Sequence, residues 1–280
     1  FSTFKGTTRF DLGPLNPDGS LDPSFDSNAG TDGVVSALAI QPDGKVLVGG
    51  FYFSVLGGVS RNRIGRLNAD GTADTGFDPG SGANNTVFDL AVQADGKILV
   101  VGEFTSLAGG ARNRIGRLNA DGSLDTSFDP PGGAGGSDVR CVAIQSDGKI
   151  LVGGSFNTLG GQSMRNLGRL NPDGTVDTSF VSPFAGPDRV ISIALQQDGK
   201  MVIGGSFSML GGLPRINIGR LNADGSVDTS FDLPGGVARG GDYIWVSTLA
   251  VQEDGKIVVG GYFYTTLGGQ PRNSLGRINT

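Results

Sequence analysis

The hydrophobic and polar positions of this chain repeat with a period of about fifty residues. Residues 34–77 show the pattern: the apolar run VVSALAIQ, the polar tetrapeptide PDGK, the second apolar run VLVGGFYF, and then RIGRLN, ADG and TADTGF. Short apolar runs separated by Asp-Gly turns are typical of antiparallel strands joined by hairpins. The pattern therefore predicts four short strands in each repeat.

Two landmarks fix the period. The aspartates of the DGK triplets give steps of 52, 52, 51 and 56 residues, and those of the LNxDG phrases give steps of 52, 51, 52 and 51. No stretch of ten residues has the 3.6-residue apolar period of a helix. Four short antiparallel strands on such a period describe one blade of a propeller. We therefore predict an all-β, five-bladed β-propeller of four-stranded antiparallel blades.

The two ends of the chain carry copies of the same third strand, FSTFKGTTRFDLGPLN at the start and FYTTLGGQPRNSLGRIN at the end. We expect the C-terminal copy to enter the ring, because Pro14 in the other copy has no amide hydrogen for a ladder. The N-terminal SLDPSF strand would then close the ring by pairing with the C-terminal blade. This divides the chain into a partial repeat at 1–16, forming an extra strand or arm, and a propeller at 17–280.

Composition narrows the functional classes. The net charge of −5 comes with no basic face, so a nucleic-acid partner is not expected. Histidine is absent, which removes Ser-His-Asp and Cys-His catalysis and most zinc sites. No apolar run is long enough for a membrane span. A single cysteine suits a secreted or cell-surface protein, and a chain that opens on Phe1 is expected to be a mature or excised piece of something longer.

The repeated phrases resemble a known family. LNADGSLDTSFD at 118–129, IQSDGKILVGGSF at 144–156 and RNRIGRLN at 61–68 are similar to the delta-60 tandem repeat, and the resemblance extends from Leu15 to Asn279. It implies a bacterial β-propeller, usually part of a large secreted or surface-exposed protein. It brings no catalytic residues with it.

The acids of the LNxDGxxD phrase have two interpretations. Asn68, Asp70 and Asp74 place oxygen atoms at alternate positions around a glycine turn, as calcium loops do, so calcium is a possible cofactor. Alternatively the phrase is a structural joint, in which Asp shapes the turn and Gly takes a positive φ. The weak metal candidates are Asp70, Asp74, Asp121, Asp125, Asp173 and Asp177. As a joint, Asp74 and its equivalents Asp22, Asp125, Asp177 and Asp228 would pair with Arg66, Arg117, Arg169, Arg220 and Arg277.

Ligand-binding residues are expected where the repeats differ, in the loops that lead into the inner strands. Each loop has a polar residue near that point, and together these could form a ring around the channel mouth for a cation or a sugar. The ring candidates are Asp32, Asn85 or its neighbour Asn84, Asp138, Asp188 and Asp242, and the longest loop adds Arg239, Tyr243 and Trp245. The alternative is that Asp and Asn simply begin strands well.

Three functions remain open. The first is a non-enzymatic, extracellular binding or scaffold module that presents variable loops to a glycan or protein partner. The second is a structural subunit that self-associates into fibres or arrays by exchange of its terminal strands. The third is a glycoside hydrolase, for which Asp89, Asp138 and Asp242 are the available carboxylates.

Overall fold

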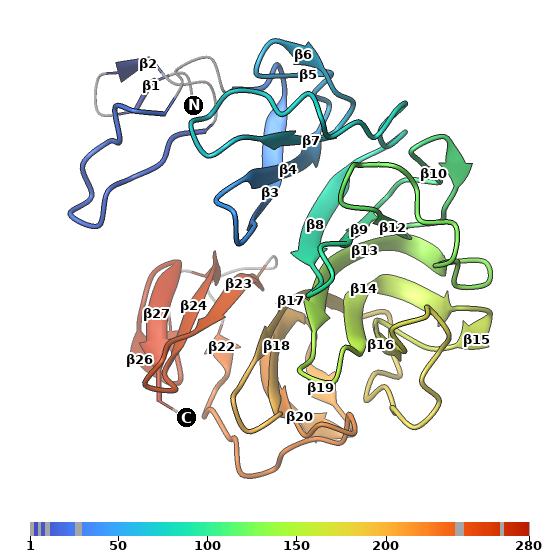
Figure 1. Cartoon of the computed structure of the whole chain (residues 1–280). Helices are drawn as coiled ribbons and strands as arrows, with labels where there is room; N and C mark the ends of the chain where they lie inside the picture. The colour runs from blue at the N-terminus through green and yellow to red at the C-terminus, as the bar shows by residue number, and fades with distance from the viewer. Residues whose placement is uncertain are drawn as a thin grey trace. The chain divides into compact units, whose positions relative to one another are not determined.

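The computed structural model describes residues 12–25, 30–238, 244–263 and 266–279, with the backbone of two short strands, β1 (Thr3–Phe4) and β2 (Thr7–Thr8). All elements described are β-strands (Figure 1). They fall into two compact units, Phe1–Asp129 and Pro130–Thr280, which we describe separately. Within the described residues no helix has the length and apolar composition that a membrane crossing requires.

The first unit contains two antiparallel three-stranded sheets built in the same way. In each, an apolar inner strand pairs with a second strand, which also pairs with a third. The strands are β3 (Val34–Ile40), β4 (Val46–Phe51) and β7 (Ile64–Leu67), then β8 (Val87–Val92), β9 (Ile98–Gly102) and β12 (Ile115–Leu118). Two-residue hairpins lie between the second and third strands: β5 (Val55–Leu56) with β6 (Val59–Ser60), and β10 (Ser106–Leu107) with β11 (Gly110–Ala111).

The second unit repeats this plan in three sheets. The main strands are β13 (Ala134–Ile144), β14 (Ile150–Leu159) and β16 (Leu167–Leu170); β17 (Arg189–Leu195), β18 (Met201–Ser206) and β21 (Ile218–Leu221); and β23 (Trp245–Val251), β24 (Ile257–Tyr262) and β27 (Leu275–Ile278). The short strands are β15 (Gln162–Ser163), β19 (Met209–Leu210), β20 (Leu213–Pro214), β22 (Val237–Ala238), β25 (Thr266–Leu267) and β26 (Gln270–Pro271). Because β27 pairs with β24, the C-terminal copy of the third strand occupies its place in the last sheet.

The prediction of a full fourth strand in every repeat is wrong. The segment after the third strand makes a single bridge back to it, as Leu67 does with Ala73 and Leu118 with Leu124. The chain then turns sharply, because the Asp74 carboxylate accepts the Gly76 amide and the Phe77 amide bonds to the Asp74 carbonyl. We call these pieces the outer segments; they span residues 16–25, 68–77, 119–128, 171–180 and 222–231.

Both Asp-Gly phrases are turns, as the joint interpretation requires. In the first repeat the Gly44 amide bonds to the Gln41 carbonyl, and the Gln41 amide bonds to the Lys45 carbonyl. Gly44 has a φ of 81° and Gly71 a φ of 85°, where a side chain would be strained.

The paired glycines of the second strands follow from a bulge in the inner strand. Every inner strand has a register shift, for example between Val35 and Ala37. The bulge brings a carbonyl close to the second strand, so a Cβ at Gly50 would lie 2.1 Å from the Val34 oxygen. In the second unit a Cβ at Gly205 would lie 2.0 Å from the Arg189 oxygen. Only glycine allows this approach.

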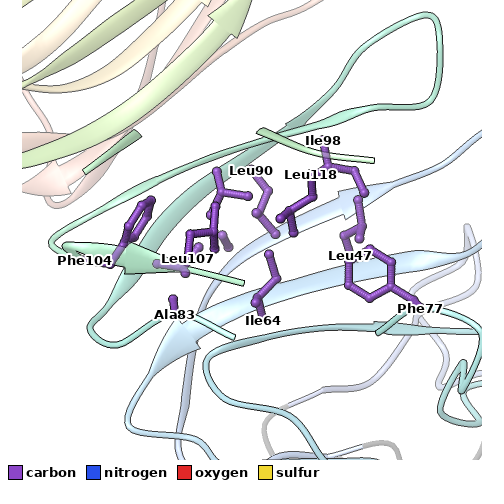
Figure 2. Packing of buried hydrophobic residues seen from close by; sticks show 12 residues of the cluster. Leu47, Ile64, Phe77, Ala83, Leu90, Ile98, Phe104, Leu107 and Leu118 are labelled. Atoms are coloured by element: carbon purple, nitrogen blue, oxygen red, sulfur yellow. The ribbon is translucent and has the colours of Figure 1, made fainter. Parts of the chain in front are cut away.

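The core lies between consecutive sheets. In the first unit, side chains from both sheets interdigitate and are excluded from water (Figure 2). Leu47, Ile64 and Phe77 of the first repeat meet Leu90 and Ile98 of the second, and all but Leu90 are fully buried. Each such side chain contributes about 1.5–3 kcal/mol of transfer free energy. A single repeat cannot bury its own apolar faces, so neighbouring sheets stabilise one another.

Candidate functional site

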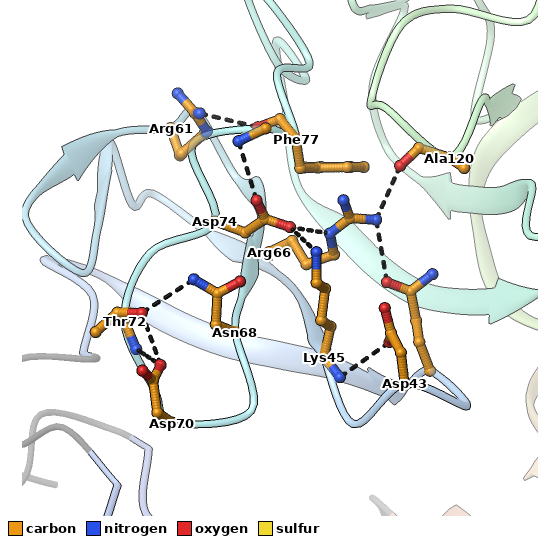
Figure 3. Close-up of polar contacts among 12 residues, drawn as sticks. Asp43, Lys45, Arg61, Arg66, Asn68, Asp70, Thr72, Asp74, Phe77 and Ala120 are labelled. Carbon is orange, nitrogen blue, oxygen red and sulfur yellow. Dashed lines mark hydrogen bonds and ion pairs between the residues drawn. The ribbon is translucent and has the colours of Figure 1, made fainter.

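The repeated acid of four of the five outer segments lies in an ion-pair cluster; Figure 3 shows the cluster around Asp74. The Asp74 carboxylate accepts hydrogen bonds from Arg66 Nε at 2.8 Å and from Lys45 Nζ at 2.9 Å. The Arg66 guanidinium also lies over the Phe77 ring, with 4.8 Å between Cζ and the ring centroid. Asp74 and Arg66 are both buried. We call this set of Asp, Arg, Lys and Phe the clamp.

In the part of the chain that the structure describes, the clamp occurs four times with nearly the same geometry. The Arg Nε to Asp distances are 2.7–2.8 Å and the Lys Nζ to Asp distances 2.8–2.9 Å. The other three clamps consist of Asp125, Arg117, Lys97 and Phe128; Asp177, Arg169, Lys149 and Phe180; and Asp228, Arg220, Lys200 and Phe231. The predicted Arg–Asp pairing is therefore confirmed in these repeats.

The environment of these acids favours their ionised form. Burial opposes ionisation of Asp125, but hydrogen bonds from Lys97, Ser127 and Arg117 outweigh it and hold the pKa of Asp125 well below its ordinary value. Hydrogen bonds from Lys200 and Ser230 likewise lower the pKa of Asp228. The carboxylates are charged and paired at neutral pH, which suits a joint and not a general acid.

The second acid of the phrase is a turn residue. Asp70 Oδ1 accepts the Thr72 hydroxyl at 2.7 Å and the Thr72 amide at 3.0 Å, and these bonds lower the pKa of Asp70. Asp121 and Asp173 make the same bonds to the residue two positions on. In the part of the chain that the structure describes, no group of three or more His, Cys, Asp or Glu side chains could hold a metal ion. Calcium binding stays a prediction to be tested.

Two of the outer segments, 119–128 and 222–231, also connect their repeat to the one before it. In the first unit, Arg66 Nη1 donates to the carbonyl of Ala120 at 2.8 Å, and the Asp78 amide donates to the carbonyl of Asp121 at 2.8 Å. In the second unit, Arg169 donates to the Ala223 carbonyl and the Val181 amide donates to the Asp224 carbonyl. The LNxDG turn is thus the acceptor that links successive blades.

The loop residues expected to line a channel mouth do not share one register. Asp32 lies before its inner strand and accepts the amides of Ser54 and Val55 and the Ser54 hydroxyl, which lowers the pKa of Asp32 to about 2. Asn84 does the same work in the next repeat by accepting the amides of Thr105 and Ser106. These two residues support the short hairpins.

The other ring candidates occupy different positions. Asn85 accepts the amide of its neighbour Thr86, Asp138 lies within β13 opposite Ser155, and Asp188 lies just before β17. Burial raises the pKa of Asp188. The described ring candidates therefore stand at more than one register position. Arg239, Asp242 and Tyr243 lie outside the described residues.

Strand register identifies a different set in the second unit. Five positions before the repeated alanine of the inner strands stand Asp138, which lies within β13, and Arg189 and Trp245, which begin β17 and β23. β13 packs against β17, and β17 against β23, so the three positions follow one another across adjacent sheets. Sequence analysis named Asp138 and Trp245 but missed Arg189. Counting back from Ala143, Ala194 and Ala250 would have found it.

The side chains at this level form two groups. Asp138 is 1% exposed; its carboxylate accepts the Ser155 amide at 3.0 Å and Arg140 Nη2 at 3.0 Å, and Arg189 Nη2 lies 3.8 Å away. Trp245 stacks on Tyr262, with ring centroids 5.0 Å apart and an interplanar angle of 16°. We call Asp138, Arg140, Arg189, Trp245 and Tyr262 the loop-end row. Guanidinium groups and an aromatic stack suit a polar ligand with flat or anionic parts, such as a sugar or a peptide.

Of the three carboxylates considered for glycoside hydrolysis, two accept hydrogen bonds within the protein and the third lies outside the described residues. Asp89 belongs to the first unit and accepts the Leu90 amide at 2.9 Å, whereas Asp138 belongs to the second and is paired with arginine. Asp242 is outside the described residues. No retaining or inverting pair of carboxylates can be assigned from these positions.

Comparison with known families assigns the chain. It matches the family described as a domain of unknown function (DUF5122) beta-propeller over residues 1–25, 41–77, 93–128, 145–180, 196–231 and 252–280. These segments cover more than half of the chain, so the protein belongs to this β-propeller repeat family. A search of curated proteins finds no significant match.

Solved structures agree at the level of the fold. The extracellular domain of a one-component system from B. thetaiotaomicron matches with 15% identity and a TM-score of 0.52, over 86% of this chain and 27% of that chain. A gluconolactonase from Xanthomonas campestris matches with 15% identity and a TM-score of 0.50, over 90% of this chain and 76% of that one. Virginiamycin B lyase from Staphylococcus aureus is 18% identical, with a TM-score of 0.48, over 91% and 69%. The first two likenesses concern the fold alone.

Proposed function

We propose that this chain is a non-enzymatic, extracellular or cell-surface binding module, in which five repeated blades hold a variable loop face toward a glycan or protein partner. The loop-end row carries the proposal. On a scaffold built of repeated strands, this row brings together an acid, two arginines and an aromatic stack within one unit, and these residues are not shared by the other repeats.

The repeated acids support a module without catalysis. Four of them are used in clamps, and the turn acids are satisfied by neighbouring hydroxyl and amide groups. An extracellular setting is supported by the sensor-protein domain that shares the fold, together with a sequence that has one cysteine. Other proteins of this fold are enzymes by name, so catalysis must be tested directly.

A glycan and peptide array tests the binding role. The purified chain is expected to retain a defined class of ligand, and Trp245→Ala and Arg189→Ala are each expected to reduce retention about ten-fold or more, since aromatic and arginine anchors dominate such sites. Arg165→Ala, at an exposed arginine outside the loop-end row, is the matched control and should bind normally. Turnover of a glycoside or lactone would contradict the non-enzymatic proposal, and equal retention by all variants would contradict the site.

A ring of five blades closed by the terminal segments is the finer architectural proposal. The five sheets support the blade number. Closure would place Leu21 against Ile278, but Leu21 is bridged to Leu15 in this structure. The N-terminal copy of the third strand, Leu12–Leu15, would have to leave that position.

A further inference from the structure

Two guanidinium groups of the loop-end row share one carboxylate. Asp138 Oδ2 accepts a hydrogen bond from Arg140 Nη2 at 3.0 Å, and Arg189 Nη2 lies 3.8 Å from the same oxygen, which is beyond hydrogen-bond distance. Among the described residues no other carboxylate lies within 4.0 Å of the Arg189 guanidinium. The two arginines together therefore carry one positive charge more than this carboxylate neutralises.

The arginines reach solvent and the acid does not. The side chain of Arg189 is 41% exposed and that of Arg140 is partly exposed, whereas Asp138 is buried and its Oδ1 atom accepts the Ser155 amide at 3.0 Å. The backbone bond fixes the carboxylate, and the carboxylate in turn orients the guanidinium groups above it. Asp138 is therefore a positioning residue, and the hydrogen-bond donors of Arg189 are directed toward the exposed side.

The next sheet carries an aromatic platform at the same register position. Trp245 begins β23 as Arg189 begins β17, and β17 packs against β23. The Trp245 and Tyr262 rings are nearly parallel, at 16°, and Tyr262 is 44% exposed. Ser206, opposite Arg189 in the ladder, is also exposed and has a hydroxyl group. A cation, a hydroxyl and a flat aromatic surface thus stand on two packed sheets of one unit.

This arrangement favours an acidic sugar over an acidic peptide. The positions on the strands are fixed by backbone ladders, so a ligand that meets them with a rigid unit loses little conformational entropy. In a uronic acid the carboxylate and the flat C–H face belong to one six-membered ring. In a peptide the carboxylate and any flat group are on separate rotatable side chains, which must be ordered on binding.

We propose that the loop-end row binds a glycan that contains uronic acid. The sugar carboxylate binds the Arg189 guanidinium through two parallel hydrogen bonds, and the positive charge of Arg140 strengthens the attraction. The ring of the same sugar or of its neighbour lies on the platform of Trp245 and Tyr262. The inference rests on the proposed binding function and deepens it by naming the class of ligand.

The test is isothermal titration calorimetry of the full chain with tetrasaccharides of galacturonic, glucuronic and mannuronic acid, each compared with its methyl ester. The ester keeps the rings and hydroxyl groups and removes the charge. We expect at least one acid to bind saturably and about ten-fold or more tightly than its ester, because a charge-assisted pair is lost in the ester. The affinity for the acid should fall in about 0.5 M salt.

Variants assign the binding to the row. Arg189→Gln should weaken binding of the acid about ten-fold or more and leave the affinity for the ester unchanged, whereas Tyr262→Ala should weaken both. Arg189→Lys keeps the charge without the two-bond geometry, so its affinity should lie between those of the wild type and Arg189→Gln. Arg165→Gln, at an exposed arginine outside the row, is the matched control and should bind like the wild type.

Four results would overturn the proposal. They are no binding of any of the three acids up to about 1 mM, equal affinity for acid and ester, unchanged binding of the acid by Arg189→Gln, or a tetraglutamate peptide that binds as tightly as the best acid. The comparison of acid with ester uses the wild-type chain alone, so it decides the matter even where a variant fails to fold.

Failure of this inference can be told apart from failure of the proposed function. If an ester binds as tightly as its acid and Trp245→Ala removes that binding, the row is a glycan site without a preference for charge, and the proposed function stands. If no glycan and no peptide is retained by the chain, the proposed function fails as well.

Discussion

Replacing Asp125 by Asn should destabilise the protein far more than the same change at an exposed turn acid of the same segment. Asp125 and Arg117 are each 6% exposed, and the carboxylate accepts from Arg117 Nε at 2.7 Å and Lys97 Nζ at 2.8 Å. Asn keeps the shape but leaves a buried guanidinium without its counter-charge. Breaking one partner of a buried pair costs about 3–5 kcal/mol. Lys97 is partly exposed, so its ammonium group can be solvated by water once Asp125 has lost its charge. We therefore expect the free energy of unfolding to fall by about 3 kcal/mol, near the lower limit of that range.

Thermal unfolding followed by circular dichroism measures this loss. For a chain of this size about 3 kcal/mol corresponds to a fall in Tm of about 6–12 °C. The matched control is Asp121→Asn, which removes a carboxylate from the same outer segment at an exposed turn and should leave Tm nearly unchanged. Equal Tm values for the two variants would refute the role of the clamp.

The pH dependence provides a second check on the same variant. The pKa of Asp125 is lower in the folded protein than its ordinary value of 3.8, so its stabilisation is complete above that pH and is lost as the pH falls below it. The Tm difference between the wild type and Asp125→Asn should therefore be largest at neutral pH and shrink below pH 4. A difference that stays constant down to pH 2 would contradict a charge-based clamp.

Three further predictions follow from the repeats and the loop-end row. Gly205→Ala should lower the free energy of unfolding by about 2–3 kcal/mol, because its Cβ would meet the Arg189 carbonyl. The control is Gly76→Ser, which introduces the residue found at this place in the other outer segments and should leave Tm unchanged. Equal Tm values for the two variants would contradict the close approach at Gly205. The Tm measured with calcium should equal the Tm measured with a chelator, because the repeated acids are already bonded within the protein. A rise of several degrees that saturates with calcium would support the calcium interpretation instead. Tyr262→Ala should increase the solvent exposure of Trp245, seen as a red shift of the emission of the single tryptophan; an unchanged spectrum would contradict the stack.

The sequence by itself determined the class of fold and the pairing of the clamps. The apolar runs, the Asp-Gly turns and the 52-residue steps are local features, and each repeat must use them in the same way. Arg66 and Asp74 are separated by a turn of known geometry, so their pairing could be predicted from spacing. The fourth strand was overpredicted because the Asp74 side chain competes with the ladder for backbone amides, which propensity does not reveal.

Only the tertiary structure decided which variable residues lie together. Asp32, Asn85 and Asp138 look alike in the sequence, but the structure gives them different partners: Asp32 accepts the amides of Ser54 and Val55, Asn85 accepts the amide of Thr86, and Asp138 pairs with Arg140. The register of the strands aligns Arg189 with Asp138 and Trp245. This alignment depends on contacts between strands about fifty residues apart in the sequence. Because side chains alternate between the two faces of a strand, a shift of the pairing by one residue would move each side chain to the other face.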